Sequence, residues 1–82
     1  MIRYKAGYKY VSTGVHAQVI DFPAAITWAA DLTQARQMLM IALVDVAEAA
    51  LEVGETLPNP DPTISDAAMD IEEPSTLIPN AL

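Results

Sequence analysis

The run from Asp31 to Gly54, DLTQARQMLMIALVDVAEAALEVG, constrains the fold of this 82-residue chain more than any other stretch. Its apolar residues recur at spacings of three and four, which is the pattern of a helix that buries one face. Asp31 is a good N-cap, and Gln34 three residues later completes a capping box. Gly54 can adopt the left-handed conformation that closes a helix. The sequence therefore predicts one long amphipathic helix.

Large apolar side chains also occur on the side of this helix away from its predicted core. Rotation by about 100° per residue places them among polar and charged residues, where a one-layer fold leaves them in water. An apolar patch on a small domain usually contacts something, although burial under the C-terminal tail would also account for it. We therefore predict a contact surface for a partner or a second copy. Its apolar members are Met40, Ile41, Val44 and Leu51.

Three acidic residues, Asp45, Glu48 and Glu52, share that side of the helix. A stripe of this spacing is commonly just a solvated face, and its functional alternative is pairing with lysines of a basic protein. The formal net charge of the chain is −7, and residues 61–82 carry acidic but no basic residues. Nucleic-acid binding needs cationic groups that displace phosphate counterions. A basic protein partner is therefore the better electrostatic match.

The residues before the helix predict a small antiparallel sheet. Residues 2–11 are rich in tyrosine, 12–14 form a glycine-containing turn, and 15–20 form a second strand. Residues 25–28 form a short third strand after Pro23, which ends the second. We expect one alternating set of the second strand to face the helix: Val15, Ala17 and Val19. The predicted class is α+β, with a small antiparallel sheet (β-β-β-α-β) and one long helix packed on one face.

The predicted domain spans residues 1–60, and 61–82 form an acidic, proline-containing tail that is partly extended or disordered. Two weak apolar runs in the tail, 64–71 and 76–82, could each add a strand or a short helix. No run is long enough to span a membrane. The chain has no cysteine and no signal-peptide pattern, so we expect a cytoplasmic protein.

Catalytic and metal-binding patterns are missing from the sequence. Metal-dependent hydrolysis needs several converging carboxylates, and the predicted sheet offers only Asp21. His16 is the sole histidine and has no cysteine or second histidine with which to share a metal. We therefore expect no enzyme, no cofactor and no metal site. Trp28 is a candidate contact residue, with Tyr8 and Tyr10, although packing is the commoner role of such aromatics.

Several of these stretches together resemble the HicB-like antitoxin family. The resemblance covers about residues 4–62, and it rests on Asp21-Phe22-Pro23, on the capped helix, and on the exit Gly54-Glu55-Thr56-Leu57-Pro58. It implies a partial RNase H-like fold without an active site, and a partner that is a small basic RNA-cleaving toxin of the HicA type. The antitoxin would mask the RNA-binding face and catalytic histidine of that toxin.

The sequence departs from the family pattern in three places. Ala24 stands where the family usually has glycine, and Ala30 replaces a small polar residue or glycine before the helix. Residues 63–82 contain no helix-turn-helix or ribbon-helix-helix segment, so the DNA binding of many such antitoxins is not carried over. Free strand edges and small size favour a homodimer or tetramer. The alternative function is a solitary oligomeric structural or regulatory module without a toxin partner.

Overall fold

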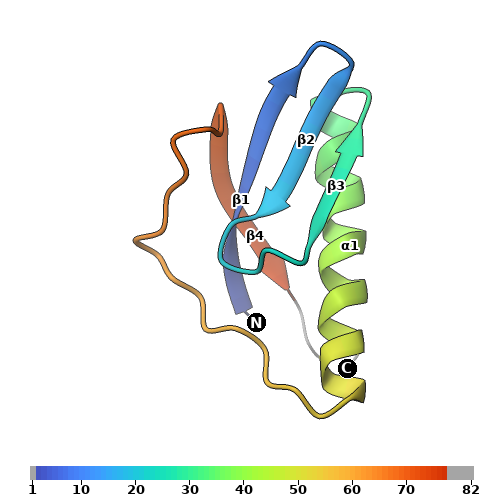
Figure 1. Ribbon diagram of the computed structural model, residues 1–82, viewed down its shortest axis with the longest axis vertical. Helices are drawn as coiled ribbons and strands as arrows, with labels where there is room; N and C mark the ends of the chain where they lie inside the picture. Colours follow the sequence, from blue (N-terminus) through green and yellow to red (C-terminus); the bar gives the residue numbers. More distant parts are fainter. Residues whose placement is uncertain (1, 78–82) are drawn as a thin grey trace.

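The computed structural model describes residues 2–77. In order along the chain, its elements are β1 (Ile2–Val11), β2 (Gly14–Val19), β3 (Ile26–Ala29), α1 (Leu32–Glu52) and β4 (Ile71–Leu77). The strands form a four-stranded antiparallel sheet in the order β3-β2-β1-β4, with α1 packed across it (Figure 1). The predicted α+β class and element order are confirmed. Within residues 2–77, no helix is long and apolar enough to cross a membrane.

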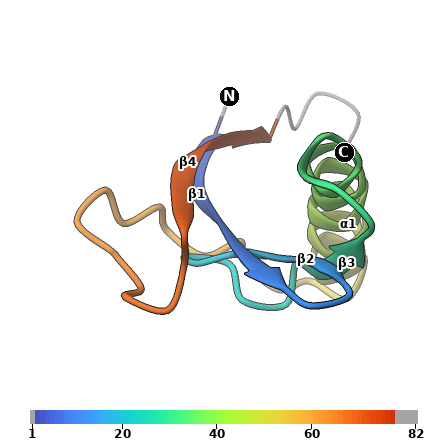
Figure 2. The ribbon, with the colours of Figure 1, turned by 90° about the horizontal axis from the view of Figure 1, so that it is seen from above.

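The sheet is curled, and α1 lies on its concave side (Figure 2). Alternation along β2 turns Val15, Ala17 and Val19 toward the helix, as predicted, and all three are buried. Their partners across the ladder share that face, because directly paired residues of antiparallel strands point the same way. The buried residues of β1 and β4 on this face include Tyr4, Ala6, Tyr8, Ser75 and Leu77.

Helix α1 begins and ends with the predicted signals. Asp31 accepts a hydrogen bond from the Gln34 N–H at 2.8 Å, and the Gln34 side chain accepts one from the Ala30 N–H at 3.2 Å. At the other end, the Gly54 N–H donates to the Leu51 carbonyl at 3.1 Å, with Gly54 at a φ of +81°. This is the left-handed closure that glycine favours. The fully buried row follows four-residue spacing: Ala35, Leu39, Leu43 and Ala47.

The chain after α1 crosses the convex side of the sheet before it returns as β4 (Figures 1 and 2). Several contacts fasten this segment. Among them, the Tyr4 hydroxyl donates to the Pro58 carbonyl at 2.7 Å, the Lys5 ammonium to the Ile64 carbonyl at 2.6 Å, and the Asp61 N–H to the Asp21 carboxylate at 3.0 Å. Residues 71–77 of the predicted tail then pair with β1 as β4. The last part of the predicted apolar run 76–82 lies outside the described residues.

Candidate protein-binding surface on helix α1

The four apolar residues predicted to form a contact surface lie on the solvent side of α1. The exposed fractions of Met40, Ile41, Val44 and Leu51 are 57%, 62%, 36% and 41%. The segment that follows the helix leaves them uncovered as far as Leu77, because it runs over the opposite face of the sheet. Burial under the described part of the tail therefore does not account for these side chains. Below, Met40, Val44 and Leu51, with Ile41 beside them, are called the apolar row.

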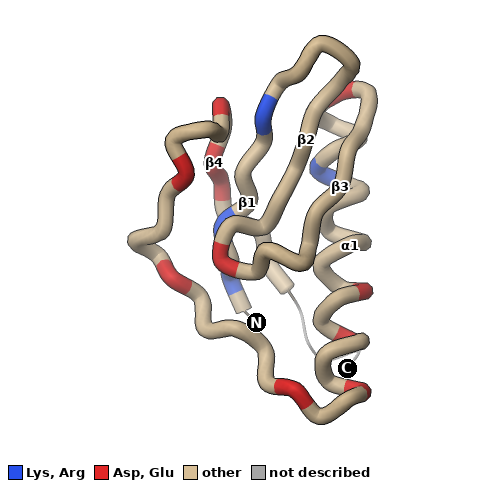
Figure 3. The backbone as a smooth tube through the Cα atoms, in the orientation of Figure 1, with Lys and Arg blue, Asp and Glu red and all other residues tan. Residues whose placement is uncertain are grey.

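Acidic residues border the apolar row along the C-terminal half of α1. Asp45 and Glu52 are exposed, and Glu48 is half-buried. At about 100° per residue, Glu48 projects between Leu51 and Glu52, so apolar and acidic side chains lie next to each other on the helix surface. Figure 3 shows that this half of the helix carries acidic and no basic residues. The combination suits a partner surface that offers both apolar area and positive charge.

One of these carboxylates, Glu52, lies at the wrong end of the helix for helix stability. The C-terminal end of a helix carries a partial negative charge that acts within the last turn, so an exposed acidic side chain there costs about 0.3–1 kcal/mol. No basic residue in the last turn offsets Glu52. A stabilising pattern would place lysine or arginine there. Glu52 therefore does not stabilise the end of the helix.

The cation of α1, Arg36, is engaged within the fold. Its guanidinium donates to both carboxylate oxygens of Glu73 on β4, at 2.8 and 3.1 Å, and lies 5.9 Å from the centre of the Tyr8 ring. Burial, and secondarily the Glu73 charge, raise the pKa of Tyr8 to about 12, so its phenol stays neutral under this ion pair. The Arg36–Glu73 pair ties the helix to β4. Sequence reasoning missed it, because no local pattern links positions so far apart.

Trp28 lies on a different surface from the helix residues. It pairs with His16 on β2, and both side chains point to the face of the sheet opposite α1. Tyr8 and Tyr10 are on the helix side, since Tyr8 pairs with the helix-facing Ala17. An aromatic patch joining these three residues therefore does not form. The eight predicted interface residues divide into seven on α1 and Trp28 on β3.

Asp21, the carboxylate of the Asp21-Phe22-Pro23 turn, has a structural role. One carboxylate oxygen accepts the Lys5 N–H at 2.8 Å, and the other accepts the Asp61 N–H at 3.0 Å. The buried side chain thereby joins β1, the turn after β2 and the segment after α1. Among residues 2–77, no three histidine, cysteine, aspartate or glutamate side chains come close enough to hold a metal ion.

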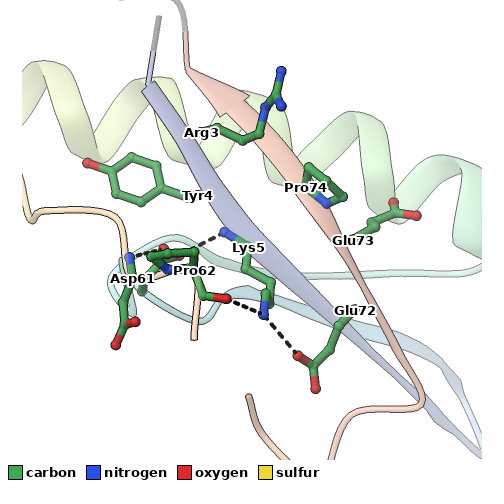
Figure 4. Close-up of a pocket in the computed structure, with 9 residues that line it drawn as sticks. Arg3, Tyr4, Lys5, Asp61, Pro62, Glu72, Glu73 and Pro74 are labelled. Carbon is green, nitrogen blue, oxygen red and sulfur yellow. Dashed lines mark hydrogen bonds and ion pairs between the residues drawn. The ribbon is translucent and has the colours of Figure 1, made fainter. Parts of the chain in front are cut away.

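A cavity of about 300 Å³ lies between β1, β4 and the segment near Pro62 (Figure 4). Its lining mixes both signs of charge, and several of the charged groups are engaged with other parts of the fold. Lys5 donates to the Ile64 carbonyl and lies 4.0 Å from Glu72, while Glu73 is held by Arg36. This arrangement fastens the segment to the sheet. It offers no nucleophile beside a base, which is the geometry that a catalytic site requires.

Comparison of the chain with protein-family models and with curated proteins finds no match in either. The likeness to HicB-like antitoxins therefore rests on the quoted motifs and on the order of the elements.

Proposed function

We propose that this chain is a HicB-like antitoxin that binds a small basic RNA-cleaving toxin of the HicA type through the outer face of α1. The observation that carries the proposal is the pairing of an exposed apolar row with carboxylates on one helix face. Two motifs support it. Asp21-Phe22-Pro23 forms the turn between β2 and β3, and the motif that begins at Gly54 follows the end of α1.

The two kinds of side chain would contribute differently to such a complex. Burial of the apolar row supplies affinity, since a large side chain removed from water contributes about 1.5–3 kcal/mol. Asp45, Glu48 and Glu52 would pair with the lysines and arginines that a toxin uses to hold RNA phosphates. A toxin occupied in this way cannot bind its substrate. Inhibition therefore needs no chemistry from the antitoxin.

Co-expression with a HicA-type toxin tests the proposal. The wild-type chain is expected to restore growth, and the triple variant Asp45→Lys/Glu48→Lys/Glu52→Lys is expected to lose protection because like charges then face each other. The double variant Ser12→Lys/Thr13→Lys is the control: it adds positive charge at the exposed β1–β2 turn and should still protect. Circular dichroism establishes that each variant is folded. Undiminished protection by the triple variant contradicts the electrostatic part of the proposal.

A second candidate, a solitary oligomeric module without a toxin, is favoured by one observation, the unpaired outer edge of β3 within the described sheet. It predicts self-association and no protection against any HicA-type toxin. The growth assay therefore separates the two candidates.

A further inference from the structure

The two edges of the sheet differ in their capacity to accept another strand. On the β4 edge, Ile71, Glu73, Ser75 and Leu77 pair with the residues of β1 whose backbone N–H and C=O groups point away from β2. The backbones of Glu72, Pro74 and Thr76 therefore point outward, and Pro74 has no N–H to offer. The Glu72 carboxylate also accepts hydrogen bonds from the Ser65 hydroxyl at 2.8 Å and the Asp66 N–H at 3.3 Å. Proline and charge are standard protection against edge pairing.

The β3 edge carries neither proline nor charge. The Val19 N–H donates to the Ala25 carbonyl at 2.9 Å, and the register then directs the Thr27 and Ala29 backbones toward β2. The backbones of Ile26 and Trp28 therefore point away from the sheet. Within residues 2–77, no hydrogen bond from outside the sheet reaches either of them. Residues 26–29 contain no charge and no proline, and Ile26 and Trp28 are 57% and 45% exposed.

We propose that this edge is a self-association site, at which β3 pairs antiparallel with β3 of a second copy about a two-fold axis at Thr27. In that register, the outward backbone groups of Ile26 lie opposite those of Trp28 from the second copy. On the other side of the axis, Trp28 lies opposite Ile26 from the second copy. Each meeting gives a hydrogen-bonded pair. It also gives a cross-strand contact between a β-branched and an aromatic side chain, which stabilises antiparallel pairs. The two sheets would become one continuous sheet.

A second copy fits this edge better than a charged partner does. The chain has a net charge of −7, so two copies repel wherever their acidic surfaces meet, yet the β3 edge itself is neutral. The Trp28 ring packs closely over Gly14, whose φ is +152°, since a Cβ at Gly14 would lie 2.8 Å from that ring. Because β4 is protected, pairing stops at a closed dimer rather than continuing into a fibre.

The proposed dimer leaves the apolar row free. Arg36, on the flank of α1 that also carries Met40, is paired with Glu73 on β4. That flank therefore faces the β4 side of the molecule, away from β3. Self-association at β3 and binding of a toxin at α1 can occur together, and the dimer does not rest on the proposed function.

A single-cysteine cross-link tests the register directly, because the chain has no cysteine of its own. At the axis, two Thr27 residues form a non-hydrogen-bonded pair with Cα atoms about 4.5 Å apart, within the range that a disulfide spans. Under copper phenanthroline oxidation, Thr27→Cys is expected to give a covalent dimer on a non-reducing gel. Thr76→Cys on the protected β4 edge is the matched control and should remain largely monomeric.

A proline on the same edge provides the second arm. Ile26→Pro, in the Thr27→Cys background, removes an outward N–H without removing a bond to β2 and is expected to weaken the dimer about tenfold or more. Circular dichroism confirms that this variant is folded, and sedimentation measures the dimer without the cysteine. The proposal is overturned if Thr27→Cys cross-links no faster than Thr76→Cys, if cross-linking is unaffected by the proline, or if the wild-type chain sediments as a monomer at all concentrations.

Discussion

At the scale of single residues, Asp21 joins three separate parts of the chain. Its two carboxylate oxygens accept N–H groups from β1 and from the segment after α1, and the side chain itself is buried. In the sequence, Asp21 reads only as a turn residue before proline. The aspartate of the resemblance motif thus acts as a clamp between distant parts of the chain. Its partners, Lys5 and Asp61, carry no local signal of the contact.

Replacing Asp21 by asparagine tests this clamp. The amide turns one acceptor into a donor that faces an N–H, so we expect Asp21→Asn to lower the free energy of unfolding by about 1–3 kcal/mol. Asp31→Asn is the matched control, because asparagine caps a helix about as well as aspartate and should change little. Urea denaturation measures both. Equal, small effects of the two substitutions would show that Asp21 is not a clamp.

At the scale of elements, α1 combines two opposed properties. Its buried row, its N-cap and its glycine closure all favour the helix, whereas Glu52 in its last turn opposes the helix dipole. The carboxylate of Glu52 therefore slightly lowers the stability of a helix end that the glycine closure favours.

Reversing the charge at the helix end should raise stability while it weakens toxin binding. Glu52→Lys removes an unfavourable dipole interaction and adds a favourable one, for a gain of about 1 kcal/mol. This gain corresponds to about 4–8 °C in Tm for a domain of this size. Gln37→Lys, which adds positive charge in the N-terminal half of the helix, should give no such gain. A Tm of Glu52→Lys at or below that of the wild-type chain would contradict the dipole argument.

At the scale of the whole molecule, local patterns predicted most of the fold and distant contacts supplied the rest. The helix and the first three strands follow from periodicity, caps and turns, and their bounds agree with prediction to within about one residue at most ends. β4 was visible only as part of two weak apolar runs, because Glu72, Glu73 and Pro74 mask strand character. Those residues are what protects an edge strand, and only its pairing with β1 identifies it.

The candidate site shows the same division. Helical spacing correctly predicted that Met40, Ile41, Val44 and Leu51 are exposed, since rotation about one axis is a local property. It could not place Trp28 relative to them, because that depends on which face of the sheet the helix covers. Ile26, which lies beside Trp28 on the open edge, was missed for the same reason. Its exposure becomes clear only once the order β3-β2-β1-β4 is known.

The most direct test of the central claim, that the outer face of α1 is a binding surface, is a calorimetric titration with a catalytically inactive HicA-type toxin. Met40→Ser/Ile41→Ser removes two side chains of the apolar row, and its Kd is expected to rise about tenfold or more. Met38→Ser, an exposed methionine on the other flank, is the control and should bind like the wild-type chain. A double variant that binds as tightly as the wild-type chain would contradict the account.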